Sequence, residues 1–130
     1  MSLHPRLRNA REKIAWSADH VYVGRPGPWG DCPCRRKGCT HSAGLGNPFS
    51  ASKHGVRRCV ELFHGMLFSS ENLQARVKQI LAAPKIAVCW CDGFDAVWCH
   101  GETYLRVADG EDVRAIERDV LARLARMEAE

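Results

Sequence analysis

Two short runs of the chain have the composition of β-strands. Residues 20–23 are rich in β-branched and aromatic side chains, and Gly24 and Pro26 follow them at once. Residues 85–90 begin with a lysine and are then apolar at five successive positions, which is typical of a strand buried on both faces. The polar and basic segment 4–18 shows neither pattern and predicts only a loose arm or a short helix.

Apolar residues at helical spacing predict the helices. The first covers residues 55–68, and a second is capped by Ser69 or Ser70 and ends before Pro84. A third begins near His100, and the last begins near Glu111. The buried sides are expected to be Val56, Cys59, Val60, Phe63 and Leu67 in the first, Leu73, Val77, Ile80 and Leu81 in the second, and Val113, Ile116, Val120, Leu124 and Met127 in the last.

This order of elements predicts the fold class. Strand, helices, strand and helices make a right-handed βαβ core, so we expect a small α/β single domain over residues 1–130, with a short parallel sheet flanked by helices and a C-terminal helix within 110–130. Ligands bind outside the carboxyl ends of such strands. The segments that follow Gly24 and Cys89 are therefore expected to meet at one edge of the sheet.

Composition and charge narrow the class of protein. The chain is 45% hydrophobic, as in ordinary globular domains, and 19 basic against 15 acidic residues give a net charge of +4. That excess is too small for strong non-specific DNA binding. No apolar run is long enough for a membrane span, and the N-terminus has no apolar signal segment, so we expect a cytoplasmic protein without a membrane partner.

The cysteines carry the strongest chemical signal. Six of the seven lie in two clusters, and each cluster ends beside a histidine. In a cytosolic chain, clustered cysteines bind metal more often than they form disulfides. The first cluster supplies four ligands within ten residues: Cys32, Cys34, Cys39 and His41. That set predicts a closed, structural zinc site that stabilises its glycine-rich loop. The alternative is a surface loop with reduced thiols.

The second cluster contains Cys89, Cys91, Cys99 and His100. Cys89 and Cys91 leave the strand on the same side, and a helix N-terminus favours the thiolate of Cys99. Neighbouring Cys99 and His100 are not expected to bind one ion without strain, which makes His100 a candidate base or a group behind the ligands. A zinc site, a thiolate nucleophile and inert buried cysteines all stay open. So do a mixed site that combines Cys34 and Cys39 with Cys89 and Cys91, and an iron–sulfur cluster.

Short motifs around these clusters resemble those of one family. They are Val21-Tyr22-Val23-Gly24-Arg25-Pro26, Trp29-Gly30, Gly46-Asn47-Pro48-Phe49, Cys89-Trp90-Cys91 and Cys99-His100-Gly101. Together they resemble family 4326 of the domains of unknown function, which is common in bacteriophages and bacteria. The resemblance covers about residues 20–108 and implies a bacterial or phage-infected host, but no activity. The family usually runs Trp-Gly directly into Asn-Pro-Phe, whereas here a Cys/His insertion at residues 31–46 intervenes.

Two functional hypotheses follow. The first is an enzyme that acts on a nucleotide or nucleic acid, in which Arg25 and Asn47 position the substrate and His100 acts with the thiols. The second is a non-catalytic, zinc-stabilised module that binds protein or nucleic acid. Both imply one or two zinc ions. The reaction, the oligomeric state and the choice between enzyme and module are left open by the sequence.

Overall fold

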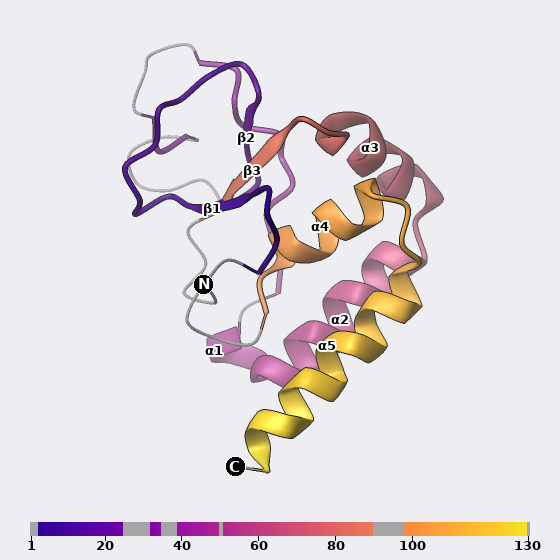
Figure 1. The fold of residues 1–130 in the computed structure, drawn as a ribbon. Coiled ribbons are helices and arrows are strands. Elements are labelled where there is room, and N and C mark those ends of the chain that lie inside the picture. The colour runs from indigo at the N-terminus through magenta and orange to yellow at the C-terminus, as the bar shows by residue number, and fades with distance from the viewer. Residues whose placement is uncertain (1–2, 25–31, 35–38, 50, 90–97, 130) are drawn as a thin grey trace.

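The computed structural model describes residues 3–24, 32–34, 39–49, 51–89 and 98–129, and every structural statement below refers to these residues (Figure 1). The strands are β1 (Leu7–Asn9), β2 (His20–Tyr22) and β3 (Ile86–Cys89). The helices are α1 (Ala51–His54), α2 (Val56–Phe68), α3 (Glu71–Leu81), α4 (His100–Ala108) and α5 (Val113–Glu128). The expected α/β class is confirmed.

The sheet is parallel and has the order β1-β3-β2. Strand β3 is central, as its apolar sequence predicts, and Ala87 and Val88 are completely buried. Val88 lies between Arg8 of β1 and Tyr22 of β2. The carboxyl ends of all three strands therefore point the same way, toward one edge of the molecule.

Strand β1 corrects the expectation of a loose arm or short helix over residues 4–18. Only Leu7 of its three residues is apolar and fully buried, while Arg8 and Asn9 are residue types without strong β-propensity. The strand forms because β3 offers it a free edge: the Ala87 amide donates to the carbonyl oxygen of Arg6 and the Ala10 amide donates to that of Cys89. Pairing between segments far apart in the chain outweighs local preference here.

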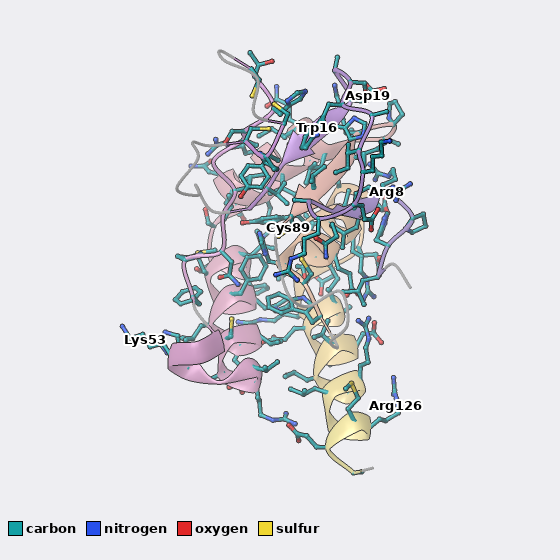
Figure 2. The ribbon with its side chains drawn as sticks, turned by 90° about the vertical axis from the view of Figure 1, so that its left-hand side faces the viewer. Arg8, Trp16, Asp19, Lys53, Cys89 and Arg126 are labelled. Atoms are coloured by element: carbon teal, nitrogen blue, oxygen red, sulfur yellow. The ribbon has the colours of Figure 1, made fainter. Side chains whose placement is uncertain are left out.

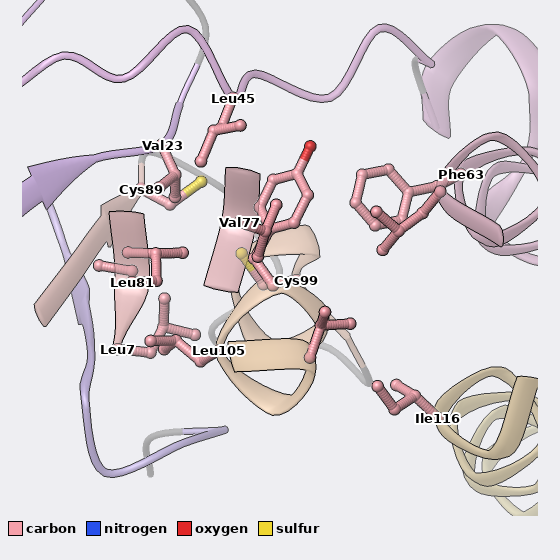
Figure 3. Close-up of a cluster of buried hydrophobic side chains, with 14 of the residues drawn as sticks. Leu7, Val23, Leu45, Phe63, Val77, Leu81, Cys89, Cys99, Leu105 and Ile116 are labelled. Atoms are coloured by element: carbon pink, nitrogen blue, oxygen red, sulfur yellow. The ribbon is translucent and has the colours of Figure 1, made fainter. Parts of the chain in front are cut away.

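Helices cover one side of the sheet (Figure 1). Helix α4 packs against β1 and β3, α3 packs against α4, and α2 lies along α5. Helices α2 and α5 are antiparallel, since Arg57 near the start of α2 pairs with Glu128 at the end of α5 at 2.9 Å. Figure 3 shows the shared core, with side chains from the sheet, from α4 and from the α2–α5 pair.

The helix boundaries follow the predicted signals. The Ser70 hydroxyl accepts from the Leu73 amide at the start of α3, and the Asp112 carboxylate accepts from the Ala115 amide at the start of α5. Two predictions of burial were wrong: Val56 is 44% exposed and Met127 is 51% exposed. Both lie at the open end of the α2–α5 pair, beyond the rest of the core. The short helix α1 carries too little periodicity to be predicted.

Buried polar groups tie α4 to its neighbours. The Glu102 side chain is 1% exposed and accepts two hydrogen bonds from Arg123 of α5, at 2.9 and 2.7 Å, and one from Arg106 at 3.2 Å. Hydrogen bonds from Arg106 also hold the pKa of Asp119 below its ordinary value. This charged clasp fixes the angle between α4 and α5.

A neutral chain of hydrogen bonds lies deeper. The Trp98 indole donates to the Thr103 hydroxyl at 2.8 Å, and that hydroxyl lies 2.9 Å from Nε2 of His64. Nδ1 of His64 lies 2.7 Å from the carbonyl oxygen of Val60, which can only accept, so Nδ1 carries the proton and Nε2 accepts from Thr103. Burial lowers the pKa of His64, which keeps the ring neutral. These contacts join α2, α4 and Trp98, which directly precedes Cys99.

Candidate metal centres

The first cluster gathers all four ligands of the Cys/His insertion. The ligand atoms of Cys32, Cys34, Cys39 and His41 lie within 4.8 Å of one another. Cys32 is buried and the other three are partly exposed. The Cys34 amide donates to Sγ of Cys32 over 3.5 Å, and Nδ1 of His41 lies 3.6 Å from the same sulfur. These four atoms surround a point that a tetrahedral cation could occupy.

The His41 ring is held for ligation through Nδ1. Its Nε2 lies 3.1 Å from the Ser17 carbonyl oxygen, which can only accept, so Nε2 carries the proton and Nδ1 offers a lone pair to the thiols. This is the usual arrangement behind a metal-binding histidine. The backbone of His41 is fixed as well, because its carbonyl oxygen accepts from the Tyr22 amide at 2.8 Å. The cluster is thereby attached to the outer edge of β2.

The environment of Cys32 disfavours the thiolate form of its side chain. Burial, with further contributions from the thiols of Cys34 and Cys39, raises its pKa to about 12 in the protein without metal. A bound divalent cation would offset that cost, because metal ligation stabilises the thiolate and releases the proton. Metal binding at this cluster is therefore coupled to proton release.

The second cluster lies where β3 ends and α4 begins. The ligand atoms of Cys89, Cys99 and His100 also lie within 4.8 Å of one another. All three residues are buried, at 1%, 1% and 3% exposure. Figure 3 shows the Cys89 and Cys99 side chains in the core, close to Val23 and Leu45. This cluster connects the central strand to the helix that covers the sheet.

The His100 ring repeats the arrangement of His41. Its Nε2 lies 2.7 Å from the Val23 carbonyl oxygen, so this nitrogen donates. Sγ of Cys89 lies 3.8 Å from Nδ1 and 3.9 Å from Nε2. His41 on its loop and His100 at the start of α4 thus each have a backbone carbonyl oxygen behind Nε2 and a cysteine sulfur near Nδ1. Such matched orientation is typical of imidazoles that bind metal.

The structure brings Cys99 and His100 together, although their adjacency predicted that both could not share one ion. Cys99 is extended, with φ −134° and ψ 141°, whereas His100 is the first residue of α4. The change of backbone conformation between them places both side chains on the same cluster. Of the other predicted site residues, Arg25 and Cys91 lie outside the described residues.

The described cysteines also address the alternatives. Cys34 and Cys39 group with Cys32 and His41, and Cys89 groups with Cys99 and His100, so the mixed site is not the arrangement seen in the described part of the chain. None of the six described cysteines forms a disulfide: Cys32, Cys34, Cys39, Cys59, Cys89 and Cys99 are all thiols.

Asn47 lies in the interior rather than in an open site. It is 8% exposed, its Oδ1 accepts from the Phe49 amide at 2.9 Å, and its Nδ2 donates to Sγ of Cys59 over 3.6 Å. The Cys59 thiol in turn donates to the Phe49 carbonyl oxygen over 3.4 Å. Cys59 is 3% exposed, as expected of a buried thiol on the apolar side of α2. These contacts fasten the Asn-Pro-Phe turn to α2.

Gly101 directly follows the second cluster and has a packing role that the motif alone does not predict. A Cβ at this position would lie 2.7 Å from Cδ1 of Leu7 and 3.7 Å from Sγ of Cys99. A side chain at this position would therefore have to displace the end of the buried Leu7 side chain. The backbone carbonyl groups of Ser17 and Val23 orient the two histidines. Their role could not be predicted from residue types, because every residue has such a group.

Gly101→Ala is expected to lower the free energy of unfolding by about 1–3 kcal/mol, because the new methyl group must displace the buried Leu7 side chain. Chemical denaturation monitored by circular dichroism measures the change. Gly65→Ala in α2, where a Cβ meets nothing within 4 Å, is the matched control and should leave stability unchanged or raise it. Equal stability of the two variants would contradict the close approach.

Comparison with known proteins identifies a family. In the described part of the chain, no helix combines the length and the apolar character that crossing a membrane requires. No curated protein and no solved structure matches the chain. One family does match, over residues 6–110, so the match includes β1 and starts earlier than the motifs alone indicate. The chain therefore belongs to the family described as "Domain of unknown function (DUF4326)".

Proposed function

We propose that this protein is a zinc-stabilised module that binds nucleic acid. Zinc is the cation that fits best, because three thiolates and one imidazole are the ligands of structural zinc sites. At the first cluster these are Cys32, Cys34, Cys39 and His41, gathered within 4.8 Å. At the second, Cys89, Cys99 and His100 supply three ligands, and Cys91 follows Cys89 closely enough in sequence to supply the fourth.

The distribution of charge along the chain supports nucleic acid as the partner. Residues 1–43 contain eight Lys and Arg against three Asp and Glu, whereas residues 44–130 contain 11 against 12. The whole basic excess thus belongs to the N-terminal third, which contains β1, β2 and the first cluster. A modest net charge of +4 conceals a strongly basic end, and such asymmetry favours binding to phosphates.

The surroundings of the proposed catalytic residues favour a binding module over an enzyme. The Asn47 side chain is directed to Phe49 and Cys59, and His100 donates to Val23. Both are buried, so neither is presented to a substrate by the described residues. An ion at the second cluster would act as a link between β3 and α4. We assign both ions a structural role.

The test is binding of fluorescently labelled DNA and RNA oligonucleotides to the zinc-loaded protein, measured by anisotropy at several salt concentrations. Affinity should fall steeply with salt, because phosphate contacts release counterions. The double variant Arg11→Glu/Lys13→Glu should weaken binding at least about ten-fold, since each reversed charge removes a contact and adds repulsion. Both residues are exposed.

A matched control carries the same change of charge at the opposite end. Arg118→Glu/Arg126→Glu replaces two exposed basic residues of α5 and should leave affinity nearly unchanged. Absence of binding to every oligonucleotide, or equal loss in the two double variants, would overturn the proposed partner.

A further inference from the structure

In the described part of the chain, no helix packs on one face of the sheet, whereas parallel sheets are usually covered on both faces. Side chains of paired residues point the same way, so Leu7, Ala87 and Val21 share one face and Arg8, Val88 and Tyr22 share the other. The first face carries Leu7, which meets the start of α4 at Gly101. The second face belongs to the loop side of the molecule, away from α4 (Figure 1).

Three aromatic rings gather on this loop side. The Trp16 ring centroid lies 4.8 Å from that of His41 and 5.5 Å from that of His20. All three side chains are partly exposed. Trp16 therefore rests against a proposed zinc ligand, and the first cluster holds the ring in place. We call Trp16, His20 and His41 the aromatic platform.

Basic residues lie on β1 and on the segment that leads to the platform. Arg8 belongs to the strand β1 on the far side of β3, and Arg11 and Lys13 are exposed on the segment that leads to Trp16. Figure 2 shows Arg8 and Trp16 at the end of the molecule opposite Lys53 and Arg126.

The acidic residues nearby are engaged locally. Asp19 pairs with Lys85 at 3.6 Å, and Glu12 accepts from the Asn9 amide over 3.4 Å. They offset part of the positive charge.

The geometry points to single-stranded nucleic acid as the ligand of this platform. We propose that Trp16 stacks on an unpaired base while Arg11 and Lys13 contact the neighbouring phosphates. This inference rests on the proposed nucleic-acid binding and names its ligand. An aromatic ring beside a basic track is the combination that binds single strands, because every base offers a flat face for stacking. In a duplex those faces are covered by neighbouring base pairs.

The other described tryptophan of the C-terminal half does not compete for this role. Trp98 is 8% exposed and donates its indole N–H to Thr103, which makes it part of the core. Phe68, by contrast, is 47% exposed on α2, where Arg114 covers its ring at 4.3 Å. Phe68 lies far from the platform in sequence and on a different element, so it serves as a matched aromatic control.

The experiment compares a labelled 12-nucleotide single strand, as DNA and as RNA, with the same sequence in duplex form. Zinc-loaded Trp16→Ala should bind the single strands about ten-fold more weakly and the duplex unchanged. Trp16→Phe should restore most of the single-strand affinity, and Phe68→Ala should bind like the parent protein. Zinc content is measured for each variant, because Trp16 contacts His41.

Each outcome has one meaning. Unchanged single-strand affinity in Trp16→Ala, or equal loss for single strand and duplex, overturns the platform. If Arg11→Glu/Lys13→Glu still weakens binding, the proposed function stands without it. Trp16→Ala could lose both zinc and affinity. If Trp16→Phe then keeps its zinc but binds the single strands as weakly as Trp16→Ala does, stacking by a ring at this position is also overturned. If the protein binds none of the oligonucleotides, both the platform and the proposed nucleic-acid binding are overturned.

Discussion

Cys99→Ala is expected to lower the zinc content by one ion per chain and to lower the melting temperature by about 10 °C or more. Cys99 is buried and shares the second cluster with Cys89 and His100. Structural zinc contributes on the order of 10 kcal/mol in small zinc peptides, whereas whole domains are stable by only about 5–15 kcal/mol. Losing even part of that contribution removes much of the stability. Elemental analysis and thermal unfolding by circular dichroism measure both quantities.

Two other cysteines serve as controls for this result. Cys59→Ala removes a thiol equally buried but outside both clusters, so zinc content should not change and stability should fall by only about 1 kcal/mol. Cys34→Ala should also cost one ion, but with a smaller loss of stability, because the first cluster lies outside the main core. If Cys99→Ala retains its full zinc content, the second cluster is not a metal site.

Arg123→Ala is expected to lower the free energy of unfolding by about 3–5 kcal/mol, because it leaves a buried carboxylate without its main partner. The Glu102 side chain is 1% exposed and accepts both hydrogen bonds that Arg123 offers. Arg106 remains as a partner of Glu102, but its guanidinium also forms ion pairs with Glu111 and Asp119. Denaturant unfolding measures the loss.

A second substitution separates loss of the pair from loss of packing. Adding Glu102→Gln to Arg123→Ala should restore part of the stability, since the unpaired charge is then gone. Arg57→Ala breaks the exposed pair with Glu128 and should cost less than about 1 kcal/mol. If Arg123→Ala costs no more than Arg57→Ala, the buried clasp does not stabilise the fold.

Local patterns predicted most of the helices and the two strands with apolar sequences. Periodicity located the buried sides of α2, α3 and α5, and continuous apolarity identified β3 as central. What they missed was decided by tertiary contacts. Strand β1 forms only because β3 offers an edge, and Met127 is exposed because no described residue covers the end of the α2–α5 pair.

The two Cys/His clusters were predictable from residue types, but their geometry was not. Spacing within the insertion correctly grouped four ligands that lie close in sequence. The second cluster joins residues from a strand end and a helix start, where the backbone changes conformation between Cys99 and His100. Periodicity rules do not apply at such a junction. The carbonyl groups of Ser17 and Val23 belong to the backbone, so no residue pattern announces their role in orienting the histidines.

Metal binding by the thiols and imidazoles of the two clusters can be tested directly. The metal content of the purified, untagged protein is measured by mass spectrometry. Its reactive thiols are titrated under denaturing conditions before and after chelation. Two zinc ions per chain, with metal-protected thiols that become reactive on chelation, is the predicted result. A protein that is folded and stable with no bound metal, and whose thiols react without chelation, would contradict it.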